Sequence, residues 1–182
     1  MVCSSCHTLQ QAGQLTYFTL LGLEARFDVD AATLRERYLQ LMREIHPDRA
    51  GEAPAGVELE RQRLSARANE AFKTLSSPVL RAEYLLELSG GQSAAEDKRV
   101  PPELLGATLM IREEIEEARA ASNSSLLAAL ARKLTSDRDR IVHTVGELAR
   151  LLPGDAALRS ELRLKLNTLR YYDRMIEQIE SD

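Results

Sequence analysis

The residue types best suited to chemistry in this 182-residue chain are gathered in two short segments. One of them is His46-Pro47-Asp48, in which an imidazole and a carboxylate flank a proline. Proline has a fixed φ and no N–H, and it disfavours α geometry at the residue before it, so a helix reaching Ile45 should stop there. The triplet therefore predicts a stiff loop that presents its imidazole and carboxylate outward, as a contact for another molecule.

The same triplet is poorly suited to catalysis. His46 and Asp48 are too close together across the proline to form a set of nucleophile, base and orienting group. The remaining histidines, His7 and His143, are far from it in the sequence, and a glycine-rich phosphate loop is missing. We therefore do not expect this chain to be an enzyme.

The second segment is Cys3-Ser-Ser-Cys6-His7, for which three interpretations stay open. C-x-x-C-H is a haem-attachment pattern of exported proteins, but the first residues show no charged and then apolar secretory signal. Cys3 and Cys6 are alternatively half of a tetrahedral zinc or iron–sulfur site, which His7 or a second chain would have to complete. They are otherwise part of a loose, reduced tail. We expect no cofactor, with zinc at Cys3 and Cys6 as the alternative.

Composition favours an all-α protein. The chain is 44% hydrophobic and 29% charged, with 4% aromatic residues and no Trp, so its core must be built mainly from Leu and Ala. Leu, Ala, Glu and Arg are good helix formers, and alternating β-branched runs are missing. The net charge of −4 disfavours nucleic-acid binding, and no apolar run reaches the ~20 residues of a membrane span. We expect a cytoplasmic protein.

The first half of the sequence predicts a helical hairpin with short flanking helices. Thr16 can cap a short helix that Gly22 ends, and Asp30 can cap a helix over 31–45. Further helices are expected over 57–75 and, after Pro78, up to 88. Apolar residues of the two hairpin helices recur at helical spacing, so that they can pack together: Leu34, Tyr38, Leu41, Ile45, Leu64, Ala68, Ala71, Phe72 and Leu75.

A polar segment over 89–100, closed by Pro101-Pro102, predicts a linker. Beyond it, long helices over 102–120, 124–151 and 155–180 are separated by short turns, which is typical of an antiparallel three-helix bundle. The predicted organisation is a flexible tail over 1–14, a first domain over 15–88, a linker over 89–101 and a bundle over 102–182.

The bundle has more apolar surface than a single core stripe needs. On its first helix Leu105 and Leu109 form a second row beside the expected core stripe. On its last helix Tyr171 lies off the expected core side, together with Leu164 and Met175. The core residues expected on the two helices are Leu104, Thr108, Ile111, Ile115, Ala118, Leu162, Leu166, Leu169 and Ile176. The extra rows are either the edges of a broad core or an exposed apolar patch for a protein partner.

Three motifs together resemble a J-domain: the segment from Tyr17 to Leu23 (YFTLLGL), His46-Pro47-Asp48, and the segment from Asn69 to Leu75 (NEAFKTL). The stretch from Ser77 to Leu86 (SPVLRAEYLL), followed by an acidic helical bundle, is similar to the HscB family, the J-type co-chaperones of iron–sulfur cluster assembly. The Gly/Phe-rich and cysteine-rich regions of DnaJ-type proteins are missing from the sequence.

The resemblance implies two protein-binding sites. The J-domain would bind the ATP form of a DnaK-class, HscA-like chaperone and stimulate its ATPase through His46, Pro47 and Asp48, with Arg37 and Arg43 meeting an acidic patch. The bundle would bind an IscU-like iron–sulfur scaffold, and aligning the family pattern places those contacts at Leu105, Leu109 and Tyr171. The alternatives are a general J-type co-chaperone for unfolded clients, or a metal or redox sensor that uses Cys3, Cys6 and His7.

Overall fold

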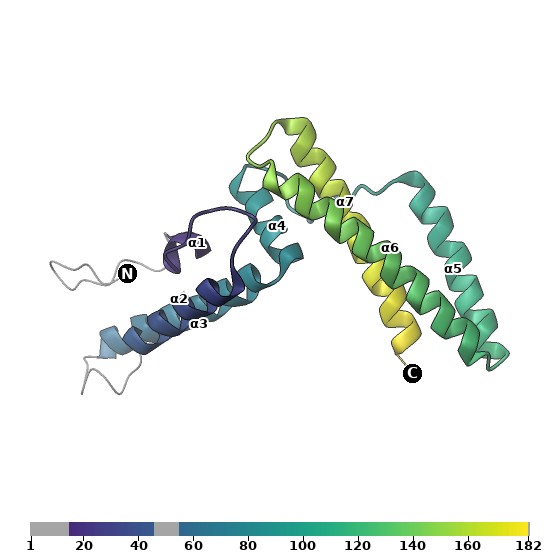
Figure 1. The fold of residues 1–182 in the computed structure, drawn as a ribbon, viewed down its shortest axis with the longest axis horizontal. Helices are drawn as coiled ribbons and strands as arrows, with labels where there is room; N and C mark the ends of the chain where they lie inside the picture. Colours follow the sequence, from purple (N-terminus) through teal and green to yellow (C-terminus); the bar gives the residue numbers. More distant parts are fainter. Residues whose placement is uncertain (1–14, 46–54, 182) are drawn as a thin grey trace. The chain divides into compact units, whose positions relative to one another are not determined.

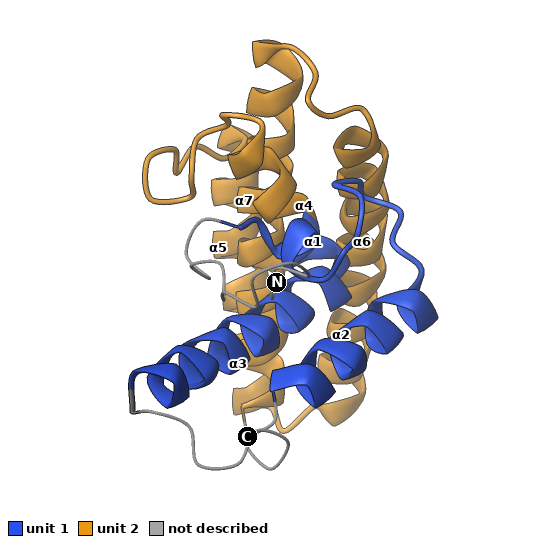
Figure 2. Cartoon of the chain, turned by 90° about the vertical axis from the view of Figure 1, so that its left-hand side faces the viewer, with its two compact units in different colours: residues 1–81 blue, residues 82–182 orange. Residues whose placement is uncertain are grey.

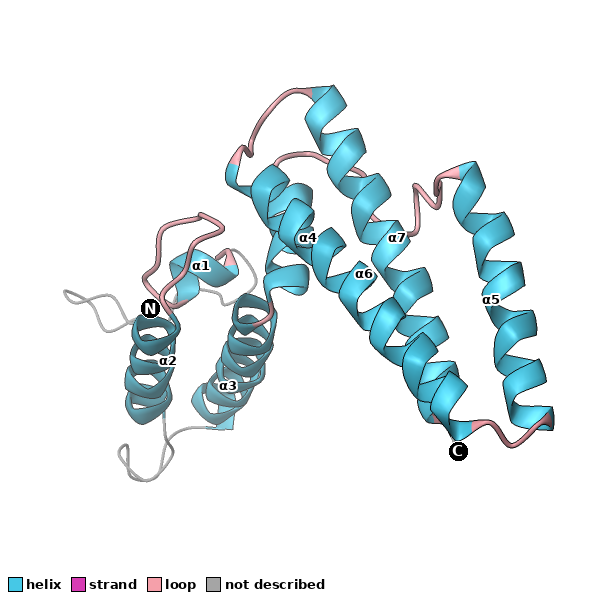
Figure 3. Cartoon of the chain, turned by 45° about the vertical axis from the view of Figure 1, so that its right-hand side comes forward, coloured by secondary structure: helices cyan, strands magenta, loops and turns pink. Residues whose placement is uncertain are grey.

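A computed structural model describes residues 15–45 and 55–181, and these residues form seven helices. The helices are α1 (Tyr17–Leu20), α2 (Ala31–Ile45), α3 (Ala55–Ser76), α4 (Pro78–Leu88), α5 (Pro102–Ala120), α6 (Ser124–Arg150) and α7 (Ala156–Glu180), as Figure 1 shows. Every regular element in the described part of the chain is a helix (Figure 3), so the predicted all-α class is confirmed. None of the described helices is long and apolar enough to cross a membrane.

The chain divides into two compact units, residues 1–81 and 82–182, drawn in blue and orange in Figure 2. The predicted first domain extended to residue 88, whereas the contacts place the division after Arg81, within α4. The second half of α4 belongs to the second unit because Glu83 accepts hydrogen bonds from Arg163 and Arg170 of α7. These long-range ion pairs leave no signature in the local sequence.

The first unit is a hairpin of α2 and α3 that α1 covers. Tyr38 of α2 stacks on Phe72 of α3 with ring centroids 4.5 Å apart, and its hydroxyl donates to Asn69 Oδ1 at 2.7 Å. α1 packs against α3, where the Arg67 guanidinium lies over the Tyr17 ring, 5.2 Å from its centroid. The residues expected to join the two helices are buried or half-buried, so the predicted stripe is confirmed.

The second unit holds the predicted bundle of α5, α6 and α7, in which α6 and α7 form the main helix pair. Each turn between the helices supplies a cap: the Asn123 side chain accepts from Leu126 N at the start of α6, and Asp155 accepts from Leu158 N at the start of α7. These caps satisfy backbone donors that a helix start leaves free. The apolar core comes chiefly from one side of each of the two helices: Leu130, Leu134, Val145, Leu148, Ala149, Leu162, Leu166 and Leu169.

One core assignment on α7 is wrong. Met175, expected on the off-core side, is buried, while Ile176, expected in the core, is only half-buried. α7 packs against both α5 and α6, so its buried surface is wider than the single stripe that a two-helix pair would need.

Candidate protein-binding sites

The predicted chaperone contacts lie around the end of α2. His46, Pro47 and Asp48 lie outside the described residues and directly follow Ile45, the last residue of α2. Arg37 and Arg43 are both exposed on that helix, whereas Leu34 and Ile45 are buried. The two guanidinium groups are therefore free to meet a partner, as an electrostatic contact requires.

The start of α2 is held by Asp30. Its Oδ2 accepts from the backbone N and from the hydroxyl of Thr33, both at 2.7 Å, which lowers the pKa of the Asp30 carboxyl. A charged cap satisfies a free N–H and complements the positive end of the helix dipole. The cap sets where α2 begins, and thereby the positions of Arg37 and Arg43 along it.

The outer side of α5 carries an apolar row. Leu105, Leu109 and Met110 are 49%, 63% and 64% exposed, while Leu104 and Thr108 on the other side of the helix are buried. The sequence left open whether Leu105 and Leu109 belong to a broad core, and their exposure excludes that alternative. An apolar row of this kind is suited to contact with another protein.

Tyr171 is half-buried on α7 and lines a pocket of about 200 Å³. Near the ends of the two helices, Arg119 of α5 donates to the carbonyl of Gln178, 59 positions later. α5 and α7 run in the same direction in this bundle, so Leu109 lies level with roughly Thr168, and Tyr171 lies about 5 Å further along the axis. The three predicted scaffold contacts therefore occupy neighbouring levels of two helices that pack together.

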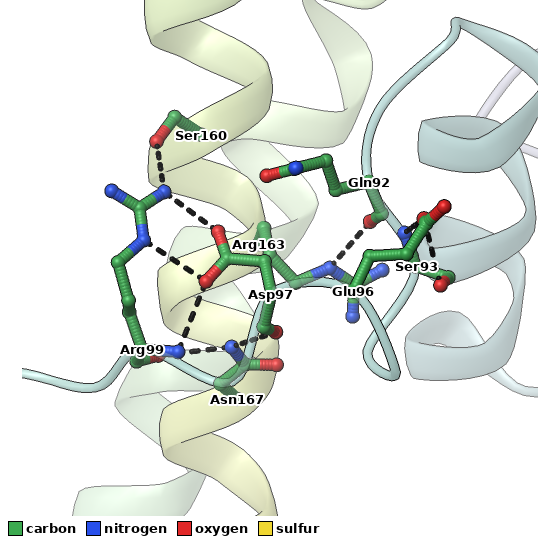
Figure 4. A network of polar contacts seen from close by, with 8 residues as sticks. All are labelled: Gln92, Ser93, Glu96, Asp97, Arg99, Ser160, Arg163 and Asn167. Atoms are coloured by element: carbon green, nitrogen blue, oxygen red, sulfur yellow. Dashed lines mark hydrogen bonds and ion pairs between the residues drawn. The ribbon is translucent and has the colours of Figure 1, made fainter.

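The segment before α5 is bound to α7 and is not a free linker. The side-chain nitrogen of Asn167 donates to the carbonyls of Asp97 and Arg99, both at 2.9 Å (Figure 4). The carboxylate of Asp97 accepts from Arg99 Nε at 2.9 Å, from Arg99 Nη2 at 2.6 Å and from Arg99 N at 3.0 Å. The bonds from Arg99 lower the pKa of Asp97 to about 2. We call residues 93–100 the strap, because they tie the start of α5 to α7.

Arg163 holds the neighbouring part of the second unit. Its side chain is 1% exposed, its Nε donates to the carbonyl of Gln92 at 2.9 Å and its Nη1 donates to Glu83 Oε1 at 2.9 Å. Arg170 donates to the same Glu83 oxygen at 2.8 Å. A buried charge needs such partners, since an unpaired one would be strongly destabilising. Arg163 of α7 therefore joins this helix to α4 and to Gln92, the residue before the strap.

The predicted metal ligands Cys3 and Cys6 lie outside the described residues, so zinc binding there stays a prediction. Within the part of the chain that the structure describes, His, Cys, Asp and Glu form no group of three or more that could hold a metal ion.

Positively charged side chains lie beside Tyr171, and the sequence analysis did not predict them. The pocket is lined by Ala94, Lys98, Asn167, Arg170, Tyr171 and Arg174. Arg170 and Arg174 are four residues apart on α7 and so share a face, a signal that was present in the sequence. Lys98 reaches the pocket only because the strap is bound to α7, and nothing local indicates that.

Comparison with known proteins agrees with this architecture. Residues 100–180 match the family model of the HscB C-terminal oligomerisation domain. A co-chaperone protein HscB homolog from Azoarcus sp. (strain BH72) is 37% identical over 131 residues, which cover 71% of this chain and 73% of that protein.

Solved structures extend the likeness to nearly the whole chain. Human co-chaperone HscB matches with a TM-score of 0.81 and 25% identity, covering 98% of this chain and 88% of its own. Chaperone HscB from Vibrio cholerae matches with a TM-score of 0.76 and 25% identity, covering 92% and 96%. These likenesses define an all-helical co-chaperone. More specifically, the chain belongs to the HscB family, as the resemblance predicted.

Proposed function

We propose that this protein binds a DnaK-class, HscA-like chaperone, stimulates its ATPase through His46-Pro47-Asp48 and delivers an IscU-like scaffold to it for iron–sulfur cluster transfer. The proposal rests on membership of the HscB family together with the exposed row of Leu105, Leu109 and Met110 on α5. The protein itself turns over no substrate in this scheme, because the ATP belongs to its partner.

The predicted chaperone contacts act by shifting the equilibrium between two conformations of the chaperone. A carboxylate at Asp48 pairs with a guanidinium of the chaperone in its ATP form, and a ligand that prefers one state shifts the population toward it. Arg37 and Arg43, exposed on α2, meet an acidic surface and raise the rate of association. Hydrolysis then follows from the altered population of chaperone states.

The predicted scaffold contacts act by burying apolar surface when the scaffold binds. Leu109 is 63% exposed, so a partner that covers it removes most of this side chain from water. Tyr171 adds an aromatic group with a polar tip, a residue type enriched among those that dominate binding energies. Binding there brings the scaffold to the chaperone as a joint complex.

The test of the chaperone end is the steady-state ATPase rate of the chaperone in the presence of the scaffold. We expect wild-type protein to raise the rate and Asp48→Asn to abolish the stimulation. Glu36→Gln, which neutralises an exposed carboxylate on α2, is the matched control and should stimulate normally. An unchanged rate with wild-type protein, or full stimulation by Asp48→Asn, would refute this part.

The scaffold end is tested by measuring the affinity for the scaffold protein by titration calorimetry. Leu109→Ala should weaken binding by about fivefold or more, because truncation of a central interface residue can cost more than about 1 kcal/mol. Leu151→Ala is the matched control, since Leu151 is 64% exposed at the end of α6, outside the proposed interface. Equal effects of the two substitutions would contradict the assignment of the α5 row.

A further inference from the structure

The pocket beside Tyr171 is positively charged, although the whole chain carries a net charge of −4. Its lining contains three cationic side chains, Lys98, Arg170 and Arg174, and no carboxylate. Arg170 and Arg174 are like charges four residues apart on one helix, an arrangement that is mildly destabilising by itself. The spacing of Arg170 and Arg174 therefore concentrates positive charge without stabilising the helix itself.

The charge is only partly balanced within the protein. Glu83 is the carboxylate that pairs with Arg170, and it is shared with Arg163. Asp97, the acidic residue of the strap nearest to Lys98, is engaged by Arg99. Lys98 and Arg174 have no carboxylate partner among the residues that the structure describes. The site thus keeps an excess positive charge that a bound anion would neutralise.

The pocket adjoins the proposed scaffold interface. Tyr171 belongs to both, and Leu109 of α5 lies at about the level of Thr168, within a turn of Tyr171 along the bundle axis. An arginine side chain can bind a carboxylate through two parallel hydrogen bonds, and the exposed ammonium group of Lys98 adds a positive charge. A partner that covers Leu105, Leu109 and Tyr171 would bring its own side chains to this pocket.

We propose that the pocket of Lys98, Arg170 and Arg174 beside Tyr171 receives an acidic side chain of the scaffold that docks on α5. This inference rests on the proposed function. To the apolar contact made by Leu105 and Leu109 it adds a polar contact that orients the scaffold. The carboxylate fixes the direction in which the scaffold lies on the bundle, because an apolar row alone leaves rotation about its centre weakly determined. Since the pocket opens to solvent, the contact contributes to the rate and specificity of association.

The experiment compares the affinity of wild type and of Lys98→Glu/Arg174→Glu for the scaffold protein, at low and at high ionic strength. We expect the double variant to bind about tenfold more weakly at low salt, with the difference shrinking as salt screens the pocket. Arg132→Glu/Lys133→Glu is the matched control, because it reverses two exposed charges on α6. Neither double variant should lower the thermal unfolding midpoint, as every substituted side chain is exposed.

Each outcome decides between the proposals. If wild type does not bind the scaffold, the proposed function fails. If wild type binds but the pocket variant and the control variant have equal affinities for the scaffold, the proposed function is retained and the pocket inference is wrong. A further arm adds inorganic phosphate or sodium chloride, at equal ionic strength, to wild type and to the pocket variant. If phosphate weakens scaffold binding more than chloride does in wild type but not in the pocket variant, an anion-binding pocket at the interface is supported. If phosphate acts equally on the two proteins, the pocket inference is wrong.

Discussion

Replacing Asp97 by Asn should destabilise the second unit in a way that depends on pH. The carboxylate of Asp97 accepts both side-chain bonds from Arg99, at 2.9 and 2.6 Å. An asparagine keeps one oxygen but turns an NH2 group toward the guanidinium, so the paired bonds are lost. The strap then remains attached to α7 by the two bonds from Asn167 and by the bond that Arg99 Nη2 donates to Ser160 Oγ at 3.1 Å.

The size of the effect follows from the pKa of Asp97, which falls from 3.8 to about 2. At about 1.36 kcal/mol per pKa unit, this difference sets an upper limit of about 2 kcal/mol on the stabilisation by the ionised carboxylate. The Arg99 side chain is 66% exposed, and solvent screens its charge, so we expect a loss of about 1 kcal/mol.

The assay is urea unfolding at a series of pH values, followed by circular dichroism. Because the folded pKa is lowered, the carboxylate's stabilisation is fully present above about pH 4 and is lost as the pH falls through about 2. At pH 7 the variant's unfolding midpoint should lie about 0.5 to 1 M lower in urea than that of wild type, for a typical slope of about 1.5 kcal/mol/M. The difference should close toward pH 2.

Glu161→Gln removes an exposed carboxylate from α7 and is the control for a change of net charge. Its midpoint should match wild type throughout the pH series. Equal midpoints of wild type and Asp97→Asn at pH 7, or a difference that persists unchanged at pH 2, would refute the reasoning.

Three further substitutions test the second unit by thermal unfolding. Gly106→Ala should stabilise it by about 1 kcal/mol, because a Cβ at this position in α5 meets open space and alanine is the better helix former; a lower midpoint would contradict this. Asp155→Ala should cost about 1 kcal/mol through loss of the 2.8 Å cap bond from Leu158 N, whereas Asp155→Asn should retain most of it. Arg163→Met should cost about 2 to 3 kcal/mol, since Gln92 and Glu83 lose a donor. Arg159→Met, which removes the bonds from Nη1 to the carbonyls of Pro153 and Gly154, is the milder control.

The helices were predictable because their ends are marked by local chemistry. Pro102 begins α5, Asn123 caps α6 and Asp155 caps α7, and each signal acts within three residues of the helix that it starts. Helical spacing also placed Leu105 and Leu109 beside the core stripe, but it left open whether they are buried, and the structure shows that they are exposed.

What the sequence did not predict depends on contacts between distant residues. The strap reads as a polar linker, and its attachment depends on Asn167, about 70 positions later. Met175 is buried although its spacing placed it off the core side, because spacing along α7 does not show how far its packing against α5 and α6 extends around the helix. The predictions for His46-Pro47-Asp48 and for Cys3 and Cys6 concern segments outside the described residues and stay predictions.

Few buried residues attach α5 to the other helices of the second unit, and this determines how binding of a partner would change its hydrogen exchange. This helix buries only Leu104, Thr108, Ile115 and Ala118, and Gly106 weakens its first turns. Because little apolar area holds it, α5 should open more readily than the α6–α7 pair, so that its amide hydrogens exchange faster with solvent. A protein that settles on the outer side of α5 would then slow exchange along the whole helix, including amides that it never touches.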